Sequence, residues 1–286
     1  MNKFERRLPW ILAGLGILLL LGAIVQVTTS LPPRSFTFLT GREGGAYYLG
    51  GQLYQKVAAR DGFTANLVPT AGSVEALHML EEGKGDVAFI QGGIAAQGDP
   101  DKVSALATVG YEPLWIFYRK DLASAAPLES PQQLQGKRLA IGEAGSGTNQ
   151  LTRLILADYG INAENTSFQE LSSSAALAGL QDGTVDAAFL VANTVAPILN
   201  DYLQDASLEL MSLSDADALA RRHRFLSVLD LPRGTLDLVD VRPRENVKLL
   251  STVANLVIRN DLHPDIVRLL AFAAVELHSP GGFFAA

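Results

Sequence analysis

Short β-prone runs alternate along the chain with longer stretches of helical periodicity. Beyond residue 35 the order is a strand at 36–40, a helix at 47–59, a strand at 65–69, a helix at 74–82 and a strand at 86–90, with glycine-rich turns between them. This βαβαβ order predicts a mostly parallel sheet with helices on its faces.

The same pattern returns about a hundred residues later. A strand at 138–141, a glycine turn and a helix at 149–159 repeat the first unit. Gly83 is matched by Gly183 and Asp86 by Asp186, an offset of 100 residues. Two copies of this length, unlike the many short copies of a solenoid, predict two lobes that face each other across a cleft.

The segments between and after the two units predict how the lobes connect. Residues 105–119 are expected to form a strand that leaves the first lobe as a hinge. A return strand is expected at 208–213, with the strand 254–258 and the helix 264–278 completing the first lobe. The expected division is 1–34 for a cytoplasmic stub, a transmembrane anchor and a linker, 35–118 with 206–286 for lobe one, and 119–205 for lobe two.

An uncharged apolar segment at residues 8–28 precedes the first unit. Its length suits a helix that spans the hydrocarbon core of a bilayer, which is about 30 Å thick. Lys3, Arg6 and Arg7 precede it, so the positive-inside rule places residues 1–7 in the cytoplasm and the rest outside. Residues 27–30 make a poor cleavage site, which favours an uncleaved anchor over a signal peptide. A buried core helix is the remaining alternative.

Composition excludes several classes of function. The 286 residues include no cysteine, so disulfides, thiolate metal sites and cysteine nucleophiles are excluded. A net charge of -7 with scattered Lys and Arg disfavours nucleic acid as a partner. The four histidines are dispersed without metal-ligand spacing, so no metal or other cofactor is expected.

The glycine turns at 41–45, 70–73 and 142–148 are the candidate binding elements. In an open α/β sheet, ligands bind beyond the carboxyl ends of the strands, where helix N-termini attract anions. Two such turns facing each other predict a carboxylate clamp. The alternative is that the glycines only permit tight turns and that Ser73 and Thr148 only cap helices.

Motifs of catalysis are lacking. Residues 142–147 have the glycine spacing of a P-loop, but Thr148-Asn149 stands where Lys and Ser/Thr are required. The dinucleotide-binding motif lacks its third glycine, and the Gly-x-Ser-x-Gly motif of hydrolases is absent. Glu43 and Glu143 occupy equivalent turns and could act in acid–base chemistry. We expect instead that these carboxylates cap helices, face solvent or, together with Arg42, contact a zwitterionic ligand. The sequence therefore does not predict an enzyme.

Four motifs together resemble the TAXI family of extracytoplasmic solute-binding proteins of TRAP transporters. They are Thr40-Gly41-x-x-Gly44-Gly45-x-Tyr47-Tyr48, Thr70-x-Gly72-Ser73-Val74-Glu75, Asp86-Val87-Ala88-Phe89-Ile90-Gln91 and Gly145-Ser146-Gly147-Thr148. The resemblance covers residues 36–200 well and the remainder more loosely. It implies an α/β, two-lobed periplasmic-binding-protein-like fold, the type II Venus flytrap, that binds glutamate, another amino acid or an oxo- or dicarboxylate and delivers it to membrane TRAP subunits.

The resemblance also implies a set of ligand-binding residues. They are Gly44, Gly45, Tyr47, Ser73 and Gln91 in lobe one, Ser146, Gly147 and Thr148 in lobe two, and Asn193 opposite Gln91.

Three features depart from the expected pattern. Arg42-Glu43 replaces small polar residues, an uncleaved anchor suits a freely moving receptor poorly, and the apolar end at 281–286 suggests that further sequence follows. The alternative is therefore a membrane-anchored sensor that signals by lobe closure, and an enzyme on the same fold is the weakest reading.

Overall fold

The computed structural model describes residues 15–20, 33–124, 126–194 and 196–279. Residues 15–20 are helical, and none of the helices in these ranges is long and apolar enough to cross a membrane. The anchor expected at 8–28 lies mostly outside the described residues and stays a prediction, as do the stub at 1–7 and the apolar end at 281–286.

Ten strands of the described chain form one sheet, in the order β2-β1-β3-β10-β4-β7-β5-β6, with β8 beside β4 and β9 beside β10. The strands are β1 (Ser35–Thr40), β2 (Thr64–Pro69), β3 (Val87–Gln91), β4 (Val103–Arg119), β5 (Arg138–Ala140), β6 (Ser167–Gln169), β7 (Ala187–Val191), β8 (Leu208–Leu210), β9 (Ser227–Leu231) and β10 (Val247–Arg259).

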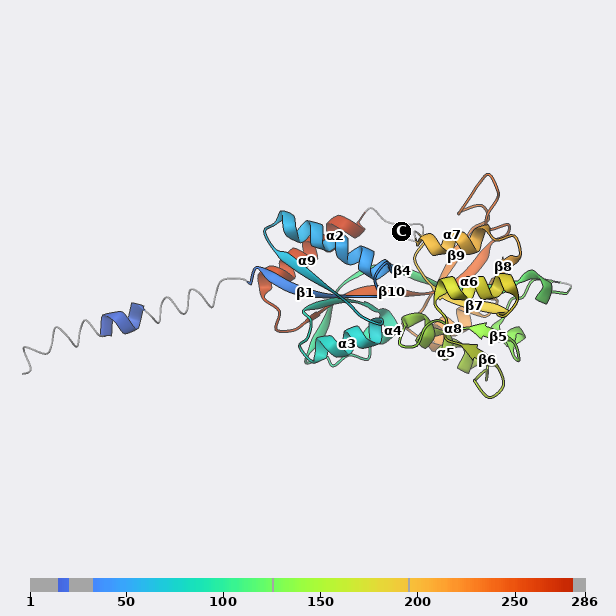
Figure 1. Ribbon diagram of the computed structural model, residues 1–286, viewed down its shortest axis with the longest axis horizontal. Coiled ribbons are helices and arrows are strands. Elements are labelled where there is room, and N and C mark those ends of the chain that lie inside the picture. Colours follow the sequence, from blue (N-terminus) through green and yellow to red (C-terminus); the bar gives the residue numbers. More distant parts are fainter. Residues whose placement is uncertain (1–14, 21–32, 125, 195, 280–286) are drawn as a thin grey trace, which may run out of the picture.

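Helices cover both faces of this sheet (Figure 1). They are α2 (Ala46–Arg60), α3 (Ser73–Glu81), α4 (Gly92–Ala95), α5 (Gly147–Asp158), α6 (Ser173–Asp182), α7 (Pro197–Gln204), α8 (Ala216–Arg222) and α9 (Pro264–His278). In one half of the molecule, α2 and α9 cover one face while α3 and α4 cover the other. In the other half, α6 and α7 lie opposite α5 and α8.

The predicted repeat is confirmed. Strands β2-β1-β3 are parallel neighbours, and β6-β5-β7 repeat that arrangement. The matched aspartates play matched parts, because Asp86 Oδ2 accepts a hydrogen bond from the backbone N–H of Thr37 at 2.7 Å and Asp186 Oδ2 accepts one from Arg138 N–H at 2.9 Å. Each repeated aspartate therefore holds the start of the first strand of its unit.

Two long strands cross from one half to the other. The 17 residues of β4 and the 13 residues of β10 pair antiparallel along most of their length. We call lobe one the part packed around β1–β3, the start of β4 and the end of β10. Lobe two is the part packed around β5–β9, the end of β4 and the start of β10.

The return crossing falls later in the chain than the expected boundary at residue 206. Strand β8 pairs with the lobe-two end of β4, and Met211, Leu219 and Leu250 belong to a lobe-two core. The chain re-enters lobe one near Ala254, whose neighbours Leu256 and Ile258 join the lobe-one core. The reason is that β10 is a single continuous strand, of which the run 254–258 is only the second half.

Candidate functional site

Three helices begin at the surface between the lobes. Their N-cap residues are Gly45 for α2, Gly72 for α3 and Ser146 for α5. In α5, Ser146 Oγ accepts a hydrogen bond from Asn149 N–H at 3.1 Å, whereas the N–H groups of Gly147 and Thr148 have no partner in the described part of the chain. The α2 and α3 starts have no side-chain cap. Free N–H groups and the positive helix ends make this surface suited to an anion.

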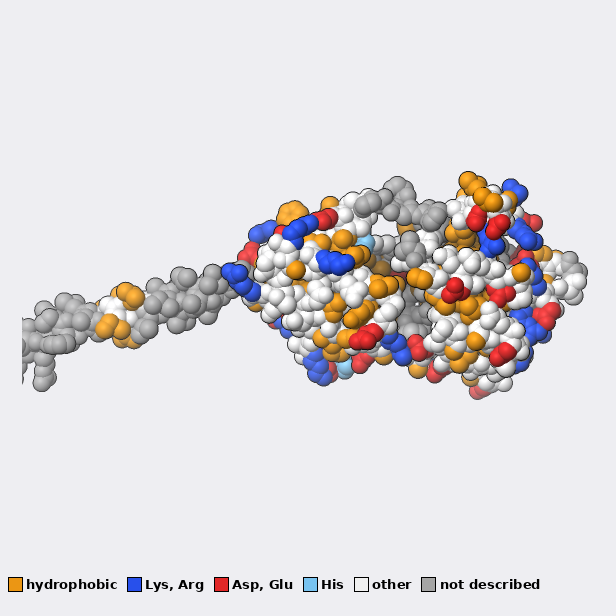
Figure 2. Space-filling model, turned by 45° about the horizontal axis from the view of Figure 1, so that its top comes forward, with side chains coloured by type: hydrophobic (Ala, Val, Ile, Leu, Met, Phe, Trp, Pro, Cys, Tyr) orange, Lys and Arg blue, Asp and Glu red, His pale blue; other side chains and the backbone are white. Residues whose placement is uncertain are grey.

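The lobes touch at these helix starts. A Cβ on Gly72 would lie 3.0 Å from Gly145 O and 3.2 Å from Ser146 Cα, and a Cβ on Gly147 would lie 2.0 Å from Gln91 Oε1. Glycine at both positions allows the loops to meet. The positive ends of α3 and α5 are thereby brought together, an arrangement that an anion between them would stabilise. Figure 2 shows the surface hollowed between the two halves.

An ion pair also joins the glycine turns of the two lobes. Arg42 Nη1 lies 3.0 Å from Glu143 Oε1. The side chain of Arg42 is 53% exposed, so the pair adds little to stability, roughly 0–1 kcal/mol. The pair shows that the two turns lie within reach of each other's side chains.

Glu112 lies in β4 at the crossing between the lobes and was not identified from the sequence. It is 9% exposed, and its Oε2 accepts a hydrogen bond from the Tyr47 hydroxyl at 2.7 Å. Burial raises the pKa of Glu112 to about 7, against the smaller opposing effect of the Tyr47 hydrogen bond. Burial and the nearby Glu112 carboxylate raise the pKa of Tyr47 well above its usual value. Tyr47 thus connects the first turn of α2 to a titratable group between the lobes.

Several buried polar atoms in this region have no hydrogen-bond partner among the described residues. They are Gln91 Nε2, Asn193 Oδ1 and Thr252 Oγ1. Gln91 is 4% exposed and ends β3, while Thr252 lies opposite Glu112 in the register of β10 and β4. An unpaired buried polar atom costs about 1–3 kcal/mol, so a bound molecule with matching groups would gain from pairing them.

The structure brings several of the predicted site residues together. Gly147, at the start of α5, touches Gln91, and Ser73 Oγ accepts a hydrogen bond from Gln91 N–H at 3.1 Å. Gly44 lies in the turn before α2 with a φ of 77°, where a side chain would be strained. The placement of Asn193 opposite Gln91 stays a prediction, as does ligand contact by the whole set.

The alternative role of Ser73 and Thr148 as helix caps is wrong. The N-caps of α3 and α5 are the residues Gly72 and Ser146. Thr148 Oγ1 instead accepts a hydrogen bond from Val191 N–H at 3.2 Å, which ties the start of α5 to the end of β7. The two side chains therefore bind neighbouring strands rather than their own helix.

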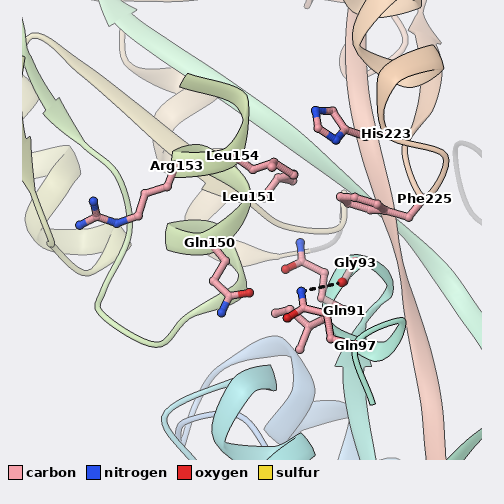
Figure 3. Close-up of a pocket in the computed structure, with 10 residues that line it drawn as sticks. Gln91, Gly93, Gln97, Gln150, Leu151, Arg153, Leu154, His223 and Phe225 are labelled. Atoms are coloured by element: carbon pink, nitrogen blue, oxygen red, sulfur yellow. Dashed lines mark hydrogen bonds between the residues drawn. The ribbon is translucent and has the colours of Figure 1, made fainter. Parts of the chain in front are cut away.

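A cavity of about 540 Å³ lies beside this region, between α4 of lobe one and α5 of lobe two (Figure 3). Gln91 is the predicted site residue that lines it. Leu151, Leu154 and Phe225 form apolar walls, and the Phe225 ring packs against Gly93, where a Cβ would lie 2.5 Å from the ring. Arg153 points away from the cavity toward its ion pair with Glu170 at 2.7 Å. The cavity is therefore bounded by both lobes, so its volume depends on how they close.

Within the described ranges no group of three or more His, Asp or Glu residues could hold a metal ion. The histidines serve locally. His223 Nε2 lies 2.6 Å from Asp158 Oδ2, and His263 Nδ1 accepts a hydrogen bond from Asp265 N–H at the start of α9. What the arrangement offers chemically is anion binding and hydrogen bonding between two lobes.

Known structures share this architecture at low sequence identity. PhnD1 from Prochlorococcus marinus MIT 9301, in complex with methylphosphonate, matches with a TM-score of 0.58 and 12% identity, over 88% of each chain. The periplasmic aliphatic sulphonate binding protein SsuA from Escherichia coli matches with a TM-score of 0.52 and 14% identity, over 87% of this chain and 75% of SsuA. The CcmR regulatory domain from Synechocystis PCC6803, in complex with 2-PG, matches with a TM-score of 0.53 and 13% identity, over 85% of this chain and 97% of that domain.

These similarities confirm the expected fold class, an α/β, two-lobed periplasmic-binding-protein-like fold. In sequence, residues 38–278 match the NMT1-like family. The match spans most of the chain, and the protein therefore belongs to the NMT1-like family.

Proposed function

We infer that this protein is a solute-binding protein that closes its two lobes around a small carboxylate-bearing molecule. The observation that carries the proposal is the meeting of the α3 and α5 starts, where Gly72 and Gly147 let the lobes touch. A carboxylate between two positive helix ends would gain from both dipoles and from the free N–H groups of Gly147 and Thr148.

Fold similarity supports small-molecule binding. The PhnD1 structure is a complex with methylphosphonate, and SsuA is an aliphatic sulphonate binding protein. Both kinds of ligand are small anions. Carboxylate preference and delivery to TRAP subunits come from the resemblance to the TAXI family. An extracytoplasmic location follows from the periplasmic SsuA and from the expected anchor at 8–28. In this scheme the solute stabilises the closed lobes, and the membrane partner binds that state.

A second candidate is a membrane-anchored sensor that uses the same closure to signal. The similarity to the CcmR domain favours it, because that protein is described as a regulatory domain and its structure is a complex with a small ligand, 2-PG. The two candidates share the binding event and differ in the partner that responds to it. Reconstitution with TRAP membrane subunits separates them, since only a transport receptor would support solute uptake into vesicles.

A thermal-shift screen of the purified full-length chain tests binding. The panel contains amino acids, 2-oxo acids and dicarboxylates, together with the amide of each compound as a control that lacks the carboxylate charge. A ligand at a hundred times its Kd adds about 2.7 kcal/mol to stability, which raises the melting temperature by a few degrees. Stabilisation by carboxylates and not by their amides supports the proposal. Equal effects of acids and amides, or no effect in a folded sample, contradict it.

A further inference from the structure

Glu112 is a buried carboxylate without a cation among its described neighbours. The buried acidic side chains of the described chain are Glu112 and Asp186. Asp186 accepts three hydrogen bonds from Arg138, including a guanidinium contact of 2.6 Å. Glu112 accepts one from the neutral Tyr47 hydroxyl. Arg42, in the nearby turn, is already paired with Glu143. Because an unpaired buried charge is costly, the partner of ionised Glu112 is expected to come from outside the chain.

Two further polar oxygen atoms near the crossing have no partner among the described residues. Thr252 lies opposite Glu112 on β10, and its buried Oγ1 has no partner in the described chain. Ala192 N–H donates to Pro113 O at 3.2 Å, which brings the next residue, Asn193, near the crossing, and Asn193 Oδ1 is also unpaired. The helix starts, by contrast, offer donors. The surface between the lobes therefore offers N–H donors for an anion at the helix starts and, at the crossing, the Glu112 carboxylate and two oxygens that can accept from a cation.

We propose that the solute carries a protonated amino group that binds the Glu112 carboxylate, so that the protein selects amino acids over 2-oxo acids and dicarboxylates that lack nitrogen. The inference rests on the proposed binding of a carboxylate at the helix starts. Tyr47 positions Glu112 through their 2.7 Å hydrogen bond, which directs one carboxylate oxygen toward α2 and leaves the other for the ammonium group.

Calorimetric titration with matched ligand pairs tests the proposal. The probes are alanine with pyruvate, and glutamate with 2-oxoglutarate, which differ by an amino group in place of a keto group. The wild-type chain is expected to bind the preferred amino acid at least tenfold more tightly than its 2-oxo counterpart. Glu112→Gln is expected to lose that preference while retaining its affinity for the 2-oxo acid. Glu164→Gln, which removes an exposed carboxylate in lobe two, is the control and should behave as wild type.

The outcomes separate this proposal from the proposed function. If the chain binds 2-oxo acids or dicarboxylates at least as tightly as amino acids, or if Glu112→Gln keeps the full preference, the assignment of Glu112 is overturned while carboxylate binding stands. If the wild-type chain binds neither class, the proposed function fails and this inference with it.

A pH titration of the unmodified chain gives a readout that does not depend on the folding of a variant. Because burial raises the pKa of Glu112 to about 7, amino acid affinity should increase about tenfold from pH 6 to pH 8 as the carboxyl ionises. Tyr47, whose pKa is raised well above its usual value, does not titrate in this range. An affinity that falls over this range overturns the proposal, because it would mean that Glu112 donates a proton to an anion.

Discussion

Replacing Glu112 with Gln should change how the stability of the protein depends on pH. The folded state raises the pKa of this carboxyl from 4.5 to about 7, mainly because the group is buried. One pKa unit corresponds to about 1.4 kcal/mol. Ionising Glu112 in the folded protein therefore costs about 3 kcal/mol more than ionising it in the unfolded chain.

The sign follows from proton binding. Between pH 4.5 and about 7 the folded state holds a proton on Glu112 that the unfolded state has lost. The wild-type protein should therefore lose about 3 kcal/mol of stability relative to Glu112→Gln as the pH rises through this range. The side chain is 9% exposed, so solvent screening of this cost is small.

Urea unfolding of both proteins at a series of pH values from 4.5 to 8, without ligand, measures the effect. The difference in unfolding free energy between Glu112→Gln and wild type should grow in favour of the variant as the pH rises. Tyr47→Phe removes the hydrogen bond that lowers the pKa of Glu112, so it should displace the transition to higher pH. A difference between wild type and Glu112→Gln that stays constant across the range would refute the assignment of a raised pKa to this group.

Two further predictions concern lobe contact and strand support. Gly147→Ala should weaken solute binding tenfold or more in calorimetric titration. Its Cβ would lie 2.0 Å from Gln91 Oε1, so either the buried Gln91 side chain must turn out of the proposed site or the lobes must stay apart. Gly110→Ala, whose Cβ meets nothing within 4 Å, should bind normally, and equal affinities of the two variants would argue against closure at this contact. Asp186→Asn should lower the unfolding free energy by about 2 kcal/mol in urea titration, since it weakens the three hydrogen bonds that the buried Asp186 carboxylate accepts from the half-exposed Arg138. An effect under about 0.5 kcal/mol would contradict that role.

The repeated unit was predictable because its signals are local. Each copy carries its own glycine turn, its apolar strands and an aspartate at the same offset, and β1, α2, β2, α3 and β3 lie within two residues of the expected elements. The helix at 264–278 was likewise found from its periodicity, and α9 has the same bounds.

The later part of lobe two was harder to assign from the sequence, because a local hydrophobic pattern does not show which strands pair with each other. The run 247–253 is less regular than 254–258, and only its pairing with β9 and β4 shows that both belong to β10. Helix α8 and strand β9, which fill the interval before it, carry short apolar patterns that fit either lobe.

Glu112 was missed for a related reason. A single charged residue in the run Tyr-Glu-Pro-Leu-Trp-Ile-Phe-Tyr at 111–118 was the available signal. Its meaning depends on burial at the crossing and on the contact with Tyr47, 65 residues earlier in the chain. The glycine turns, by contrast, could be compared with each other within the sequence. The sequence therefore indicated the helix starts of the site but not the carboxylate between the lobes.

Closure of the lobes around a solute changes the distance between them, and this distance can be measured. The chain has no cysteine, so Lys56→Cys in lobe one and Ala163→Cys in lobe two give two unique sites for spin labels, and both positions are exposed. Pulsed electron resonance then reports the distance between the labels with and without the solute found by the thermal-shift screen. We expect saturating solute to narrow the distribution to one short distance, as the α3 and α5 starts meet. A distribution that is unchanged by a solute known to be bound would contradict it.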